Sequence, residues 1–156
     1  MISVEEKISN SIKWIDNLNP EVGFKKITDT LGVHNSEINT WDEVTDFKNQ
    51  GKYCCLGVAC ITLNMVRNKN NEYQFVFSQG NDYRLTEHLG FLASGGTFKK
   101  DGMNTCLNFI RGTAKGLIEL NDNICKMDDD FKTVREVILK NIDIIFIPDV
   151  AKALKE

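Results

Sequence analysis

The segment Tyr53-Cys54-Cys55-Leu56-Gly57-Val58-Ala59-Cys60 constrains the fold more than any other part of the chain. From this segment to Val66 nearly every residue is apolar or small. A helix that is apolar on all sides belongs in the interior of a protein, because it has no face to offer to water. The sequence therefore predicts a buried helix over residues 54–66, with the Cys60 side chain facing inward.

Amphipathic segments elsewhere are expected to pack around this helix. Ser3 and Glu6 form a capping box, and apolar residues at helical spacing follow them until the chain reaches Pro20. Similar patterns predict two short helices in the middle of the chain, one after a Thr40 cap and one from Thr86 to Gly90. Two more are predicted near the C-terminus. The first follows an Asp130 cap and carries Phe131, Val134 and Ile138 on one face, and the second lies around Val150–Leu154. The sequence thus predicts a helix-rich protein.

Strand patterns are fewer and shorter. Alternating residues at Tyr73–Phe77 predict a half-buried strand, and the glycines between Ser94 and Asp101 predict a turn within a hairpin or loop. The segment Ile142–Ile147 is apolar and β-branched, and it stops at Pro148. There is no internal repeat and no long linker. We therefore expect one compact α+β domain over residues 1–156, helix-rich, with a small antiparallel sheet or hairpin.

Charge and composition exclude several classes of function. The net charge of -3 provides no positive field for nucleic acid. The apolar run Ile144–Ile147 is far shorter than the ~20 residues that span a bilayer, and the first residues lack the order of a signal peptide. Five cysteines is an odd number without a disulfide spacing. We expect a cytoplasmic protein with free thiols that binds neither nucleic acid nor membrane.

Three pieces of the chain occur in a recognisable order: Tyr53–Cys60, then Leu89-Gly90-Phe91, then Leu120-Asn121-Asp122 before the helix near Phe131. This order resembles a family of small, mostly uncharacterised proteins of tailed phages and bacteria. The resemblance covers roughly residues 50–140, and residues 123–129 depart from the family pattern as an insertion. It implies a phage accessory protein that works in the cytoplasm of the host, and it lends no activity to particular residues.

The cysteines suggest an enzymatic interpretation. A thiol at a helix start lies in the positive end of the helix dipole, which lowers its pKa. Cys55, His88 and Asn121 follow the Cys, His, Asn order of papain-like hydrolases. A cysteine-dependent hydrolase or transferase would use Cys55 as nucleophile, His88 as base, and Asn121 or Asp122 to orient the base. Alternatively, the thiols of this segment are small core side chains.

Metal and cofactor patterns are weak. The cysteine spacing does not match a zinc site, and the acidic residues between Asn121 and Asp130 lack the register of a calcium loop. The glycines match neither a dinucleotide fingerprint nor a P-loop. We therefore expect no metal and no cofactor. Lys99-Lys100 and Arg111 with Lys115 could hold a phosphate, although such pairs usually form a solvated face.

The interpretation that we favour from the sequence is a non-enzymatic binder. It would capture a small nucleotide-type defence signal, or else occupy a host protein. The ligand is expected near the Cys55 helix start, where free amides can hold an anion, with Asn121 or Asp122 reading a base or ribose edge and His88 nearby. Asn121 is also expected to hydrogen-bond the helix start over residues 54–57. A homo-oligomer would help a chain of this size to form a deep pocket.

Overall fold

A computed structural model describes residues 2–30, 32–34, 51–69, 72–75, 82–92, 97–99, 106–108 and 113–156. Its helices are α1 (Val4–Asn17), α3 (Cys55–Thr62), α4 (Asp82–Leu89), α5 (Thr113–Glu119), the π-helix η1 (Leu120–Ile124), α6 (Lys132–Lys140), α7 (Ile142–Ile145) and α8 (Pro148–Leu154). Its strands are β1 (Lys25–Lys26), β2 (Gly32–His34), β3 (Gly51–Tyr53), β4 (Val66–Lys69), β5 (Glu72–Phe75), β6 (Thr97–Lys99) and β7 (Cys106–Asn108). The fold is α+β and helix-rich, as the sequence predicts. None of these helices is both long and apolar enough to cross a membrane.

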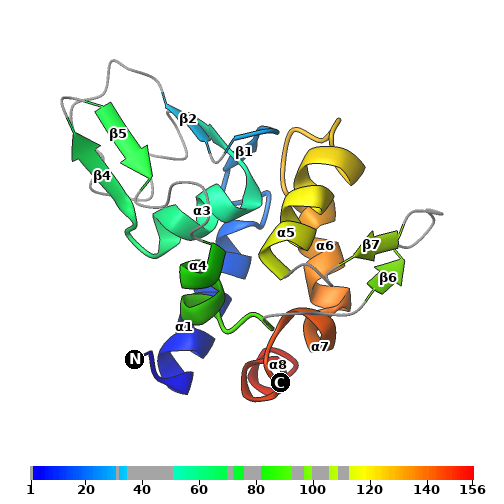
Figure 1. Cartoon of the computed structure of the whole chain (residues 1–156). Helices are drawn as coiled ribbons and strands as arrows, with labels where there is room; N and C mark the ends of the chain where they lie inside the picture. Colours follow the sequence, from blue (N-terminus) through cyan, green and yellow to red (C-terminus); the bar gives the residue numbers. More distant parts are fainter. Residues whose placement is uncertain are drawn as a thin grey trace.

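Helix α3 occupies the middle of the core. It packs against α1, α4 and α5, which lie around it in Figure 1. Every residue from Cys55 to Ile61 is buried, and Cys60 has an exposed fraction of 0%. This confirms the buried helix and the inward Cys60. The predicted end at Val66 is wrong, because Asn64 takes a left-handed conformation (φ 57°) and turns the chain into β4.

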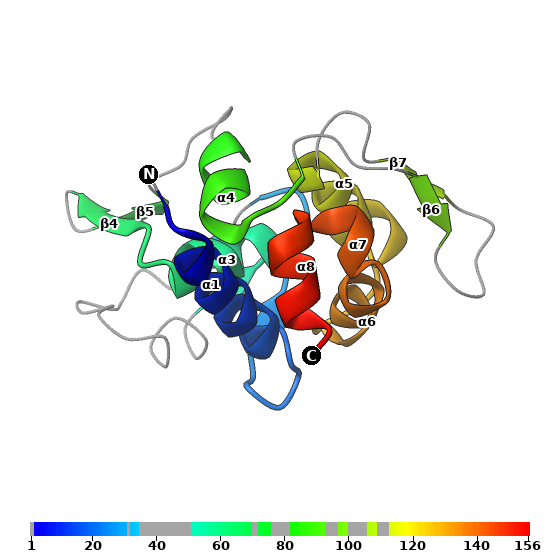
Figure 2. The same ribbon diagram turned by 90° about the horizontal axis from the view of Figure 1, so that it is seen from below.

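Helix α1 begins at the predicted cap. The Ser3 side chain accepts a hydrogen bond from the Glu6 amide at 3.1 Å. At the other end of α1, the Trp14 indole donates to the Cys55 carbonyl at 2.8 Å and so fixes α1 against α3. Figure 2 shows α8 between α1 and α7, two helices that it contacts. The N-terminal and C-terminal helices therefore close the same side of the core.

The sheet next to α3 is mixed. Strand β3 lies in the middle of the order β1-β3-β2, and it pairs parallel with β1 and antiparallel with β2. The expected antiparallel sheet is therefore wrong at β1. A parallel neighbour requires a crossover between the two strands, and strands of two or three residues are too short for periodicity to reveal it. Strands β4–β5 and β6–β7 form two-stranded antiparallel ribbons that project to either side of the helices (Figure 1).

In the C-terminal third, the two predicted helices are present, whereas residues 142–147 differ from the prediction. The Asp130 side chain accepts from the Lys132 amide at 3.0 Å, at the start of α6, and Val150 is buried in the expected last helix. The β-branched segment after residue 141 forms the helical turn α7, and only Phe146 makes a strand-like bridge, to Phe91. Pro148 begins α8, where its fixed φ suits the first turn of a helix.

Helix α4 is longer than expected, because it begins at Asp82 rather than near Thr86. Gly90 ends it with a φ of 69°, as the sequence predicts. The helix expected after Thr40, and the glycine turn of residues 94–96, lie outside the described residues. The strand expected at Tyr73–Phe77 is described as far as Phe75, within β5.

Candidate functional site

The start of α3 is a buried network of hydrogen bonds. Cys54 is the N-cap, and its sulfur accepts from the Gly57 amide at 3.3 Å. The next amide, of Cys55, donates to Oδ1 of Asn121 at 3.1 Å, although 66 residues separate the two in sequence. The first amides of a helix have no partner within the helix, so these two side chains supply the missing acceptors. The predicted contact between the helix start and Asn121 is confirmed.

Asn121 joins three parts of the core. The π-helical turn η1 carries this side chain into the interior, where its exposed fraction is 0%. Its Nδ2 donates to the carbonyl of Ile27 at 3.0 Å and to Oδ1 of Asp122 at 2.7 Å. Because an asparagine has only two N–H donors, both are used within the protein. Asn121 therefore connects α3, η1 and the residue that follows β1, and has no donor left for a ligand.

The thiols at the helix start are protonated core groups at neutral pH. Burial raises the pKa of the Cys55 thiol well above its ordinary value, and the nearby Lys26 charge only partly opposes this. The Cys55 thiol donates to the Leu117 carbonyl at 3.7 Å. Burial also raises the pKa of Cys54 to about 11, despite hydrogen bonds from the Gly57 and Leu56 amides that lower it. Desolvation therefore outweighs the helix dipole here.

His88 is not joined to this network. It lies half-buried in the last turn of α4, and its backbone carbonyl accepts from Nδ2 of Asn10 at 3.0 Å. Among the hydrogen bonds of the described residues, none connects the His88 imidazole to Cys55 or Asn121. The structure thus brings together Cys55, Asn121 and Asp122 of the expected site and leaves His88 apart. Within the same described ranges, no group of three or more His, Cys, Asp or Glu side chains could hold a metal ion.

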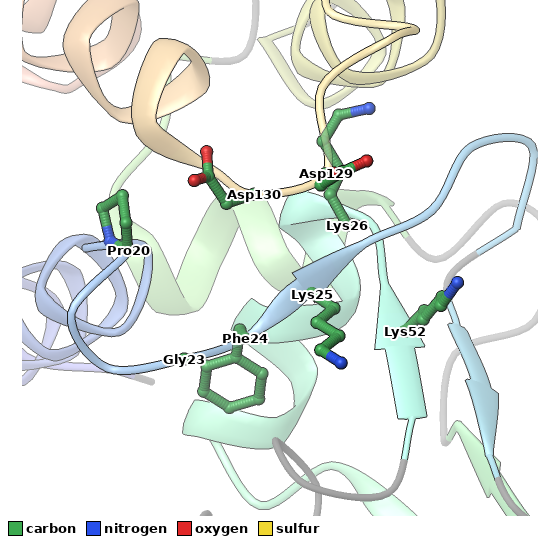
Figure 3. A pocket seen from close by; sticks show the side chains of 8 residues that line it. All are labelled: Pro20, Gly23, Phe24, Lys25, Lys26, Lys52, Asp129 and Asp130. Atoms are coloured by element: carbon green, nitrogen blue, oxygen red, sulfur yellow. The ribbon is translucent and has the colours of Figure 1, made fainter.

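A pocket lies beside β1, on the border of the mixed sheet (Figure 3). Its volume is about 430 Å³, within the range of small-molecule sites, roughly 300–1,000 Å³. The residues that line it are Pro20, Gly23, Phe24, Lys25, Lys26, Lys52, Asp129 and Asp130. Of its charged residues, Lys25, Lys52, Asp129 and Asp130 are exposed, whereas Lys26 is buried.

The lysines of this pocket are not neutralised by its aspartates. Lys25 and Lys52 are exposed and lie opposite each other on the parallel strands β1 and β3. Like charges at opposed positions of a sheet repel each other. Considering only residues that the structure describes, no salt bridge links either lysine, or Lys26, to Asp129 or Asp130. Lys25 and Lys52 therefore present positive charge beside two carboxylates with which they form no salt bridge.

Lys26 differs from the other two lysines because it is buried. Its exposed fraction is 6%, and its Nζ has no hydrogen-bond partner in the described part of the chain. Figure 3 shows the side chain extending from β1 past Asp129, away from Lys25. The Lys26 amide donates to the Asp129 carbonyl at 2.7 Å, which holds β1 against the loop before α6.

The two regions share strand β1. Lys26 lines the pocket, and the next residue, Ile27, accepts the hydrogen bond from Asn121. The network at the α3 start therefore fixes one wall of the pocket. The sequence pattern did not predict Lys25, Lys26 or Lys52 as site residues. The available signal was a charged pair between Phe24 and Ile27, which is too short to show which lysine points inward.

Comparisons with protein-family models, with curated proteins and with solved structures give no match to this chain. The likeness to phage proteins therefore stays an expectation from the motifs.

Proposed function

We propose that the protein is a non-enzymatic binder that captures a small, anionic, nucleotide-type ligand in the β1 pocket. The observation that carries the proposal is the group of three lysines in a cavity of about 430 Å³, none of them paired with the cavity's two aspartates. Unpaired cations in a concave site attract an anion and gain partners when it binds. In the phage setting, the ligand is a host defence signal that the protein sequesters.

The expected ligand residues change their role in this proposal. Cys55 and Asn121 hold the wall of the pocket instead of touching the ligand, because their polar groups are bound to each other and to the backbone. Lys25 and Lys52 face solvent and attract the anionic part of the ligand. Phe24 also lines the cavity, but its ring is buried and packs edge-on against Tyr53, so it supports the cavity instead of contacting the ligand.

The alternative, a cysteine-dependent hydrolase, has less support. A buried thiol with a raised pKa is a poor nucleophile, since only the thiolate attacks. Alkylation of the native protein at pH 7 distinguishes the two. We expect Cys55 to react only after unfolding, as measured by mass spectrometry of the labelled peptides. Rapid labelling of Cys55 in the folded protein would favour the enzyme.

Cargo analysis tests the binder directly. The protein is produced in cells that make nucleotide defence signals, purified and heated, and the released molecules are identified by mass spectrometry. We expect an anionic, phosphate-bearing molecule from the wild type, and much less from the double variant Lys25→Gln, Lys52→Gln.

A charge-matched control is available on the helices. Lys13 on α1 and Lys115 on α5 are exposed and do not line the pocket. The double variant Lys13→Gln, Lys115→Gln changes the net charge equally and should keep its cargo. If the two double variants lose cargo equally, the anionic ligand is attracted by the overall charge of the protein and not by the lysines of the pocket. If wild-type protein releases no small molecule, and calorimetry detects no nucleotide binding, the proposal fails.

A further inference from the structure

The two exposed lysines of the pocket lie opposite each other on neighbouring strands. Lys25 of β1 and Lys52 of β3 are partners in the parallel register of the sheet. Opposed residues of neighbouring strands project from the same face, and such strands lie about 4.8 Å apart. Both side chains are exposed, and both residues line the cavity (Figure 3). The sheet therefore holds two positive charges side by side at the cavity.

The repulsion between these two charges is not relieved within the described part of the chain. No salt bridge among the described residues includes Lys25 or Lys52. The carboxylates of the cavity lie on the loop before α6, on a different element from the lysines (Figure 3). One of them, Asp130, accepts a hydrogen bond from the Lys132 amide at 3.0 Å. An anion that contacts both ammonium groups would relieve the repulsion.

A single phosphate group has the size and charge to do this. A lysine side chain is a flexible four-carbon chain that ends in a compact charge, and exposed side chains exchange rotamers freely. A terminal phosphate carries about -1.5 to -2 charges at pH 7 and three acceptor oxygens, so it can neutralise two ammonium groups at once. A phosphodiester carries one charge, and it would leave the pair of lysines with a positive charge in excess.

We infer that Lys25 and Lys52 act as a pair that holds one phosphate group, and that this pair selects ligands with a terminal, dianionic phosphate over phosphodiesters. The inference rests on the proposed function and names the ligand class of the same pocket. Nucleotides with a free terminal phosphate are favoured over cyclic nucleotides and over nucleotides joined through a diester.

The test follows binding at each lysine separately. Protein isotopically labelled at its lysine side chains is titrated with methyl phosphate, a dianionic monoester, and with dimethyl phosphate, a monoanionic diester, at pH 7.5 and fixed ionic strength. The Cε signals of Lys25 and Lys52 should shift together, with one dissociation constant. Methyl phosphate should bind about 5- to 10-fold more tightly than dimethyl phosphate, the factor expected when one further charge meets two exposed ammonium groups.

Single substitutions show whether the two lysines act as a pair. In Lys25→Gln, the Lys52 signal should report methyl phosphate binding that is weakened at least about 3-fold, because the phosphate has lost one of its two contacts. Lys52→Gln should have the same effect at Lys25. Lysines that bind independently would keep their own affinities in these variants, and that result would overturn the inference. So would equal binding of both esters to wild type.

Two controls separate the pair from the charge of the region. Lys132→Gln removes an exposed positive charge at the start of α6, outside the lining of the cavity, and should leave both affinities unchanged. Lys25→Arg keeps the charge at the strand position and should keep the preference for the monoester. All of these side chains are exposed, so the melting temperatures should stay close to that of wild type. Weakening in Lys132→Gln as large as in Lys25→Gln would also overturn the inference.

Failure of the inference is separable from failure of the proposed function. If the esters bind equally, or bind at each lysine independently, while heating releases an anionic cargo, the pocket binds its ligand without a phosphate-selecting pair. If neither ester shifts the lysine signals, the inference fails and the cargo alone decides the proposed function. If cargo is absent as well, both fail.

Discussion

The start of α3 and the β1 pocket lie on the two sides of one short strand, and they treat their polar groups in opposite ways. At the helix start, Cys54 and Asn121 satisfy the buried amides. At the pocket, the three lysines have no salt-bridge partner among the residues that the structure describes, and the ammonium of Lys26 is buried. The most distinctive sequence motif, Tyr53–Cys60, therefore has a structural role, whereas the lysines without salt-bridge partners among the described residues lie next to it.

The difference follows from what each set of side chains can do. Cysteine and asparagine are small, so they fit into the core and accept from specific backbone amides. Lysines carry a charge that the core cannot neutralise without an anion. Removing a side chain from the helix start should therefore destabilise the protein, while removing a lysine from the pocket should change binding. The predictions below test this contrast.

The largest effect is expected inside α3. Cys60→Asp places a carboxylate at a position with an exposed fraction of 0%. An uncompensated buried charge should lower the free energy of unfolding by roughly 4 kcal/mol or more, measured by urea denaturation. Cys60→Ala is the control, and it should cost much less because it introduces no charge. An unchanged urea midpoint for the aspartate variant would contradict the burial of this face.

Asn121→Ala should be the next most damaging change. It leaves the Cys55 amide and the Ile27 carbonyl without their partner. Leaving these two buried groups without a hydrogen-bond partner should lower the free energy of unfolding by roughly 3–4 kcal/mol. Asn123→Ala, an exposed change in the same turn, should stay within about 0.5 kcal/mol. Ligand binding should fall together with stability in Asn121→Ala, because Asn121 fixes a wall of the pocket, and should be unchanged in Asn123→Ala. A loss of binding at full stability would make Asn121 a ligand residue.

These two positions show what the sequence could reveal. The burial of Cys60 followed from thirteen nearly continuous apolar residues, and the Asn121 contact followed from the need of a helix start for acceptors. Lys26 could not be found in this way. Its burial depends on a hydrogen bond between β1 and Asp129, about a hundred positions along the chain, and a two-residue strand has no period. The mixed sheet could not be predicted either, because its strands are too short to show a periodic pattern.

Alkaline pH should weaken the helix start. The pKa of Cys54 rises from 9.0 to about 11 on folding because the thiol is buried. Between these values the folded protein keeps a proton that the unfolded chain has lost, so stability is full below pH 9 and falls as pH rises toward 11. The loss from Cys54 alone should be roughly 2–3 kcal/mol.

The matched variant for this pH effect is Cys54→Ser. A serine hydroxyl is a good N-cap and does not ionise in this range, so the variant should lose less stability than wild type between pH 9 and 11. The remaining loss comes from other groups whose pKa values are raised by burial, among them Cys55, Cys60 and Tyr53. Identical pH profiles for the variant and wild type would mean that the Cys54 thiol is not desolvated.

Substitutions of the exposed pocket lysines should not destabilise the protein, in contrast to those at the helix start. Lys25→Gln, Lys52→Gln should change the free energy of unfolding by less than about 0.5 kcal/mol, because both side chains are exposed. The direction should be toward higher stability at low salt, since the two like charges oppose each other across β1 and β3. Thermal unfolding at two salt concentrations measures this. A destabilised double variant would show that these lysines have partners in the folded protein.

The smallest effect is expected from a chelator. The thiols of the α3 start are buried, and the sulfur atoms of Cys54 and Cys55 are both engaged in hydrogen bonds with backbone groups. No set of three metal-binding side chains lies together in the described ranges. The melting temperature with excess EDTA should therefore equal that of untreated protein. Structural zinc contributes on the order of 10 kcal/mol to folding, so a metal would be seen as a large fall. A large fall in melting temperature would mean that the cysteines bind a metal. The helix start would then no longer differ from the pocket in having all its polar groups hydrogen-bonded within the protein.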